Sequence, residues 1–134
     1  MNFEWNENMA VGNKDIDNDH KYLFSLIRTI DAAIECHVQA NVLEKYVELM
    51  VIYTAVHFSR EEQYQKIIGF KEIESHKLLH VEFSGKLNSI RQILAQAEND
   101  QEKYKTTAAQ LNQLVRDWWS QHIMIEDLKM KETR

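Results

Sequence analysis

The scarcity of helix-breaking residues is the feature that most limits what this chain can fold into. The 134 residues contain no proline and three glycines, which favours long helices over a sheet. Apolar side chains also recur at steps of three and four along residues 17–37, 41–66, 71–96 and 101–121, which is the period of a helix that buries one face. We therefore predict four helices at about these positions. They follow an irregular arm at about residues 1–16, which Trp5 is expected to anchor.

The links between the expected helices are short. They fall around residues 38–40, 69–70 and 98–100. Short links oblige consecutive helices to run antiparallel. The predicted fold is therefore all-α: an antiparallel up-down-up-down four-helix bundle with an irregular N-terminal arm, formed by residues 1–134 as a single domain.

Composition narrows the expected partners and compartment. The net charge is −5, and the chain has no basic run of the kind that binds nucleic acid. It has no apolar run long enough to span a bilayer, and its start lacks the apolar segment of a secretory signal. The single cysteine, Cys36, cannot form an internal disulfide and fits a reducing compartment. We expect a cytoplasmic protein that neither binds nucleic acid nor inserts into a membrane.

Histidine placement is the strongest indication of function. Five of the six histidines fall on the apolar stripes of the predicted helices, together with two carboxylates. A histidine that faces a core is costly unless its ring nitrogens find partners, so five that face one core indicate a bound metal. The seven candidate metal ligands are His20, His57, Glu61, His76, His80, His122 and Asp127.

The candidates are predicted to meet at one height in the bundle. His57 lies 12 residues before Gly69, in the second link, and His80 lies 11 residues after it. Glu61 and His76 lie 8 residues before and 7 residues after the same glycine. At a rise of about 1.5 Å per residue, the members of each pair differ in height by only about 1.5 Å. The sequence thus predicts that separate helices bring their histidines together.

The donor set indicates the kind of metal. Nitrogen-rich ligation with some carboxylate suits a transition metal rather than calcium or magnesium. Five imidazoles are too many for one tetrahedral zinc ion. They suit two six-coordinate ions bridged by carboxylates, whose negative charge offsets the repulsion between the cations. The four-carboxylate pattern of ferritin-like oxygen-activating sites is absent, which favours reversible binding over oxidation of a substrate.

These motifs resemble those of the hemerythrin family, in particular the single-domain bacterial hemerythrins. The resemblance covers nearly the whole chain. A lone His-x3-His is common, so the order and spacing of the full set carry the resemblance. The matching stretches are Trp5 in the arm, Ile16-Asp17-x2-His20, His57-Phe58-x2-Glu61-Glu62, His76-x3-His80 and Trp118-x3-His122-Ile123-x3-Asp127.

The resemblance implies a non-haem di-iron centre that binds dioxygen reversibly, for oxygen storage or delivery and without enzymatic activity. The cofactor would be two iron ions (Fe2+/Fe3+), one of which keeps an open coordination position. The ions would be bridged by Glu61, Asp127 and an oxo or hydroxo group. The resemblance assigns His76, His80 and His122 to one iron, and His20 and His57 to the open one.

One position departs from the family pattern. The family usually has leucine directly after the tryptophan that matches Trp118, and this chain has Trp119 there. That leucine lies beside the oxygen pocket in the family. The substitution therefore implies altered oxygen release and autoxidation, while the fold and the metal ligands are unaffected.

Several residues near these motifs are expected to be structural. Glu62 is predicted to be a solvated surface acid, and residues 129–134 are predicted to fray. An acidic patch is predicted to favour the dipole of the first helix, namely Asp15, Asp17 and Asp19. The core, and in part the wall of a dry oxygen pocket, is predicted to include Phe24, Phe58, Leu79, Trp118, Trp119 and Ile123.

Three other functions stay open at the level of sequence. The same site in a sensor would alter contacts with a partner protein when oxygen or redox state changes. An enzyme, such as a peroxidase or a nitric oxide scavenger, would need a substrate cleft or a second acid–base pair that the motifs do not indicate. A zinc protein would use the same ligands and would be colourless.

Overall fold

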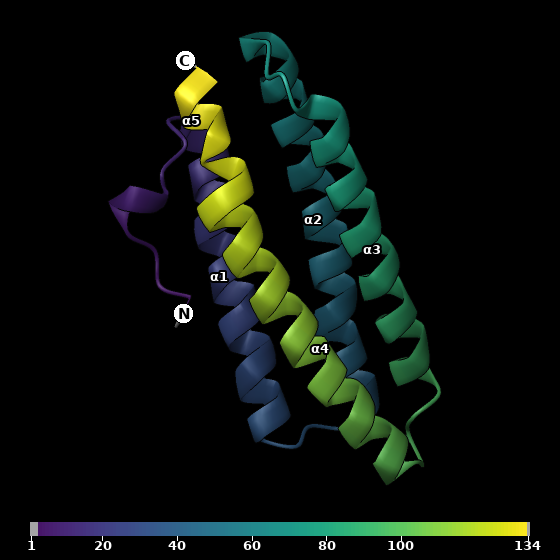
Figure 1. The fold of residues 1–134 in the computed structure, drawn as a ribbon. Coiled ribbons are helices and arrows are strands. Elements are labelled where there is room, and N and C mark those ends of the chain that lie inside the picture. The colour runs from purple at the N-terminus through teal and green to yellow at the C-terminus, as the bar shows by residue number, and fades with distance from the viewer. Residues whose placement is uncertain (1–2, 134) are drawn as a thin grey trace.

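Four long helices form the body of the molecule in the computed structural model, which describes residues 3–133. They are α1 (Lys14–Glu35), α2 (Ala40–Ile68), α3 (Ile73–Ala95) and α4 (Gln101–Gln121). The α1–α2 and α3–α4 links lie at one end of the bundle and the α2–α3 link lies at the other, so consecutive helices run antiparallel (Figure 1). The predicted four-helix bundle is confirmed. Among residues 3–133, no helix has the length and apolar character that crossing a bilayer requires.

Local sequence sets where the helices begin and end. The Asn13 side chain accepts a hydrogen bond from the Ile16 amide at 3.0 Å, so α1 begins earlier than predicted. Asp100 caps α4 in the same way, through the Lys103 amide at 3.0 Å. Gly69 ends α2 with a φ of +69°, in the left-handed region that glycine adopts without strain.

The N-terminal arm contributes more to the core than predicted. It runs beside α1 (Figure 1) and contains one short 3-10 helix, η1 (Glu7–Met9). The side chains of Phe3, Met9 and Val11 are buried, whereas Trp5 is half-buried against the core. The anchoring that was expected from Trp5 therefore falls mainly on these three apolar residues.

The C-terminal end departs from α-helical geometry. After α4 the chain forms a π-helical stretch, η2 (His122–Asp127), and then a short helix, α5 (Lys129–Thr133). Met130 is fully buried in a small apolar cluster with the arm. The predicted fraying is therefore wrong for residues 129–133, and Arg134 lies outside the described residues.

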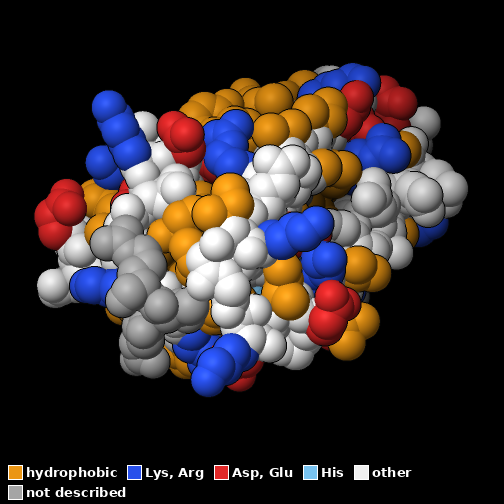
Figure 2. All heavy atoms as spheres, turned by 90° about the horizontal axis from the view of Figure 1, so that it is seen from above, with side chains coloured by type: hydrophobic (Ala, Val, Ile, Leu, Met, Phe, Trp, Pro, Cys, Tyr) orange, Lys and Arg blue, Asp and Glu red, His pale blue; other side chains and the backbone are white. Residues whose placement is uncertain are grey.

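The interior changes character along the bundle axis. The half next to the α1–α2 and α3–α4 links, called the apolar half here, has a core of fully buried aliphatic side chains. They include Ile27, Ile30, Leu43, Met50, Leu87, Leu94 and Leu111. The half next to the α2–α3 link, called the polar half, buries histidines and carboxylates instead. Seen from that end, the surface mixes charged and apolar side chains and shows almost no histidine (Figure 2).

Candidate metal centre

The seven residues singled out in the sequence lie together inside the polar half. Each is at most 2% exposed. Their ligand atoms form two groups, and within each group the atoms lie within 4.8 Å of one another. One group is Glu61, His76, His80 and His122, and the other is His20, His57, Glu61 and Asp127. The candidates come from three bundle helices, α1, α2 and α3, and from η2, which directly follows α4.

Glu61 faces both histidine groups. Its Oε1 lies 2.8 Å from His76 Nε2 and 3.0 Å from His80 Nε2. Its Oε2 lies 3.2 Å from His57 Nε2 and 3.5 Å from His20 Nε2. One carboxylate on α2 thus presents one oxygen to each group.

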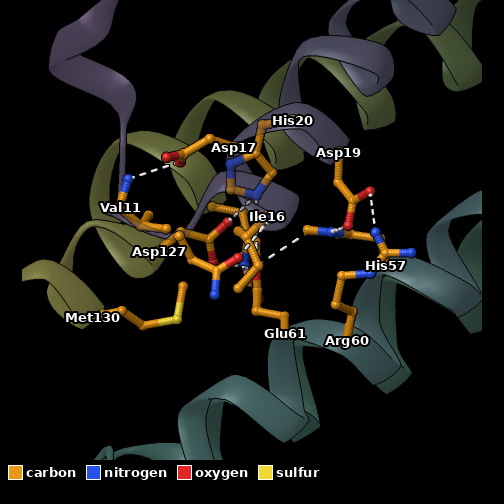
Figure 3. A network of polar contacts seen from close by, with 12 residues as sticks. Val11, Ile16, Asp17, Asp19, His20, His57, Arg60, Glu61, Asp127 and Met130 are labelled. Carbon is orange, nitrogen blue, oxygen red and sulfur yellow. Dashed lines mark hydrogen bonds and ion pairs between the residues drawn. The ribbon is translucent and has the colours of Figure 1, made fainter. Parts of the chain in front are cut away.

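Asp127 repeats this arrangement from the other side. Its Oδ1 lies 2.9 Å from His122 Nε2 and 3.1 Å from His76 Nε2, and its Oδ2 lies 3.0 Å from His20 Nε2. Figure 3 shows Asp127, Glu61 and His20 pointing toward one another. In an α-helix, residues five apart point about 140° away from each other. The π-helical i→i+5 pattern of η2 brings them onto one face instead, which is why His122 and Asp127 both reach the site.

Two carboxylates outside the predicted set accept hydrogen bonds from the ring nitrogens that point away from the site. His57 Nδ1 donates to Asp19 Oδ2 at 2.9 Å, and His80 Nδ1 donates to Glu62 Oε2 at 2.8 Å. Because a carboxylate can only accept, each bond fixes the proton on Nδ1 and turns Nε2 toward the site. The predictions of a solvated Glu62 and of a dipole role for Asp19 are therefore wrong.

Both residues were missed for the same reason. Each is a sequence neighbour of a candidate ligand, and neighbours on an α-helix point about 100° apart, so neither lies on the apolar stripe. Asp19 lies directly before His20 but serves His57 on the adjacent helix. An acidic residue next to a candidate ligand, on each of two helices, is the sequence signal that would have found them.

Asp17, in the same acidic patch, accepts a hydrogen bond from the Val11 amide at 2.8 Å and ties the arm to α1 (Figure 3).

Asp19 is held in place by three donors. Besides His57, the Tyr53 hydroxyl donates to Oδ1 at 3.1 Å and the Arg60 guanidinium donates to it at 2.9 Å, and Figure 3 shows Asp19 beside His57 and Arg60. Burial raises the pKa of Asp19, but the hydrogen bond and charge of His57, with Tyr53 and Arg60, outweigh burial and lower the pKa. Asp19 therefore stays ionised and keeps the His57 ring fixed.

The charges inside the site balance one another. Burial lowers the pKa of His20 and of His76, but hydrogen bonds and charge from Asp127 and Glu61 raise both values to about 10. Burial raises the pKa of each carboxyl, and the Glu61 charge adds to this at Asp127, yet the facing imidazoles dominate and lower both pKa values. The two carboxylates thus require buried positive charge, which either imidazolium protons or metal ions can supply.

The remaining hydrogen-bonding capacity of the site fits metal ions. Six buried atoms of the candidate ligands have no hydrogen-bond partner among residues 3–133, and such atoms are costly in a protein interior. They are His20 Nδ1, His20 Nε2, His57 Nε2, Glu61 Oε2, Asp127 Oδ1 and Asp127 Oδ2. An ion in the group of His20, His57, Glu61 and Asp127 would give a partner to four of them, and an ion beside His76 and His122 would give one to Asp127 Oδ1.

Comparison with known proteins decides the family. Residues 11–133 match the family described as Hemerythrin HHE cation binding domain. The chain belongs to the hemerythrin family. One relative is the Bacteriohemerythrin of Clostridium acetobutylicum, 29% identical over 93% of this chain and 95% of the relative. The Myohemerythrin of Sipunculus nudus is 32% identical over 96% of this chain and 91% of the relative. The resemblance drawn from the motifs is confirmed.

Aromatic rings wall the site in this member of the hemerythrin family. Phe58 stacks on His80 at a centroid distance of 3.8 Å, and Trp118 stacks on His122 at 4.1 Å. Of the predicted core residues, Phe24, Phe58, Trp119 and Ile123 are buried, whereas Leu79 and Trp118 are half-buried. Trp118 packs against the same core, and both half-buried side chains line a surface cavity.

Trp119 occupies the position at which this hemerythrin chain departs from the family pattern. Its indole is fully buried, and the ring centroid lies 6.0 Å from that of His57 and 6.0 Å from that of His122. Within the described part of the chain, the buried Nε1 has no hydrogen-bond partner. The large side chain therefore packs directly against the histidine groups.

Proposed function

We propose that the chain binds dioxygen reversibly at a pair of iron ions, for oxygen storage or delivery. The observation that carries the proposal is the placement of Glu61 and Asp127, each of which turns one oxygen toward each histidine group. Bridging carboxylates in this position would hold two cations close together and offset their repulsion. The ligands of one ion would be His76, His80 and His122, and those of the other would be His20 and His57.

The proposed division of the histidines, three at one ion and two at the other, would leave one coordination position for a small ligand. Two bridging carboxylates and one bridging oxygen would give each six-coordinate ion three donors. Three histidines would complete one set, and two would leave the other set one donor short, beside His20 and His57. When bound, a ferrous pair supplies the two electrons that dioxygen accepts and returns on release.

The surrounding residues fit a binding role. Asp19 and Glu62 fix the orientation of two imidazoles, so little needs to reorganise when a ligand binds. The rings of Phe58, Trp118 and Trp119 pack against three of the histidines and limit the contact of the site with water, which would slow hydrolytic side reactions and proton leakage. The burial of all seven candidate ligands favours a very small ligand over a substrate that needs a cleft.

An oxygenation cycle tests the proposal. The chain is reconstituted anaerobically with ferrous salt, exposed to air and then purged with argon, while iron per chain and the visible spectrum are followed. We expect two irons per chain, a colour that appears with oxygen and its disappearance on purging. A colourless chain that holds two zinc ions as purified would identify a zinc protein. Irreversible oxidation with turnover of peroxide or nitric oxide would identify an enzyme.

Kinetics separate the remaining roles. Stopped-flow association and dissociation rates, with the autoxidation rate, distinguish an oxygen carrier from a sensor. A carrier should release oxygen many times before it autoxidises. Oxygen release no faster than autoxidation would contradict storage or delivery and favour the sensor.

A further inference from the structure

The burial of the candidate ligands raises the question of how a metal ion reaches them. A cavity of about 200 Å³ lies between α3, the end of α4 and η2, and one candidate ligand lines it. Its lining residues are Leu79, Glu82, Trp118, Gln121, His122 and Glu126. This cavity connects the surface of the polar half with the three-histidine group.

His122 marks the inner end of the cavity. The ring is 2% exposed, and its contacts with His80, Glu61 and Asp127 all use Nε2. The ring stacks on Trp118, which lines the same cavity. An ion that entered through the cavity would therefore meet this imidazole as its first nitrogen donor, on the way to the centre that Nε2 faces.

The outer part of the cavity carries oxygen donors. The Glu82 side chain is 58% exposed and the Glu126 side chain is 23% exposed, and Gln121 is exposed beside them. Lys86 pairs with Glu82 at 3.0 Å and Lys129 pairs with Glu126 at 3.3 Å. Ion pairs at the surface are weak, so both carboxylates can exchange a lysine for another cation.

The size of the cavity matches a hydrated ion. Its volume of about 200 Å³ is several times the roughly 30 Å³ that a water molecule occupies in the liquid, so an ion with part of its water shell fits. Carboxylates concentrate cations in a cleft and offer nothing to a neutral diatomic molecule. The two carboxylates of the lining therefore favour a divalent cation over dioxygen as its occupant.

One segment links the two ends of the cavity. η2 carries Glu126 at the outer part and His122 at the inner end, and it also carries Asp127 of the metal centre. π-helical segments are rare and recur at functional sites. An ion that passed from Glu126 to His122 would therefore travel along one segment.

We propose that this cavity is the route by which hydrated iron(II) reaches the buried centre, with Glu82 and Glu126 as transient ligands and His122 as the first permanent one. The inference rests on the proposed function, because it requires iron at the site. It assigns to two surface glutamates a role in loading and exchange that is separate from oxygen binding.

Isotope exchange in the iron-loaded protein tests the route. The reduced protein is mixed anaerobically with isotopically labelled iron(II), and replacement of bound iron is followed by mass spectrometry. The double variant Glu82→Gln, Glu126→Gln should exchange about tenfold more slowly than the unmodified chain, with iron per chain and the midpoint of thermal unfolding unchanged. Gln121→Lys, which places a cation in the same opening, should also slow exchange.

The matched control removes two charges at the opposite end of the bundle. Glu98→Gln, Glu102→Gln should exchange within twofold of the unmodified rate. The route is overturned if the Glu82, Glu126 variant exchanges at the unmodified rate, or if the control slows exchange equally, since net charge would then be the cause. A chain that holds no iron at all would instead overturn the proposed function.

Discussion

The two halves of the bundle share the same four helices but are stabilised in different ways. In the apolar half, Leu43, Leu87 and Leu111 meet in a core whose burial contributes about 25 cal/mol per Å² and requires nothing bound. In the polar half, the same helical stripes bring imidazoles and carboxylates together, and their burial costs free energy unless each charge is paired. Helical periodicity therefore determines which side chains face inward, and their chemistry determines whether that half is stable without a cation.

The largest expected difference between the halves is in their response to pH. In the metal-free chain the pKa values of His20 and His76 are raised to about 10 from an ordinary value of 6.5. A raised pKa stabilises the folded state fully below pH 6.5, and this stabilisation is lost as pH rises through about 10. At about 1.4 kcal/mol per pKa unit, we expect the free energy of unfolding to fall by several kcal/mol across this window.

Chemical denaturation of the metal-free chain at a series of pH values measures this loss. The iron-loaded chain is the control, since its imidazoles would be unprotonated and held by metal, and it should be nearly insensitive to pH over the same range. If the free energy of unfolding of the metal-free chain stayed constant between pH 6.5 and 10, protonated imidazoles paired with carboxylates would not be what stabilises the polar half.

A matched pair of truncations separates the halves directly. His122→Ala leaves Asp127 and Glu61 short of a buried partner, so we expect a loss of about 3 kcal/mol in the metal-free chain and a fall from two irons per chain to one or fewer. Leu111→Ala leaves a cavity in the apolar half and should cost about 3 kcal/mol with and without iron, while two irons remain. Denaturation and metal analysis give both quantities. Two irons in His122→Ala would mean that the ligand assignment is wrong.

A smaller effect is expected from a residue that orients a candidate ligand without binding metal itself. Asp19→Asn removes the charge that orients His57, so the affinity for the iron assigned to His20 and His57 should fall about tenfold, as measured by competition with a chelator. Asp31→Asn is the control in the apolar half, where Asp31 pairs with Arg116 and accepts from Asn112 at 2.9 Å. Equal iron affinities in the two variants would remove Asp19 from the account.

The smallest expected effect on iron content is at the boundary between the halves. Trp119→Leu restores the residue usual in the family and removes a buried indole that packs 6.0 Å from His57. We expect oxygen release and autoxidation to change severalfold in stopped-flow experiments, while two irons per chain remain. Loss of iron from this variant would show that the indole supports the ligands rather than only lining the pocket.

Most of the fold follows from the sequence, and the site follows in part. Apolar stripes and short links predict the bundle, and distances from Gly69 predict that His57 and His80 share a level. Asp19 and Glu62 were not predicted, because they lie off the apolar stripes and hydrogen-bond to histidines on a neighbouring helix. The π-helical turn that brings Asp127 back to the site has no signature in the apolar pattern, and the buried tail depends on contacts with an arm more than a hundred residues away in the sequence.

A crystal structure of the anaerobically iron-reconstituted chain, with anomalous data at the iron absorption edge, tests the central claim most directly. We predict two anomalous peaks in the polar half, one among His76, His80 and His122 and one beside His20 and His57, with Glu61 and Asp127 lying between them. A single peak, or none at these side chains, would contradict a paired metal centre in this bundle.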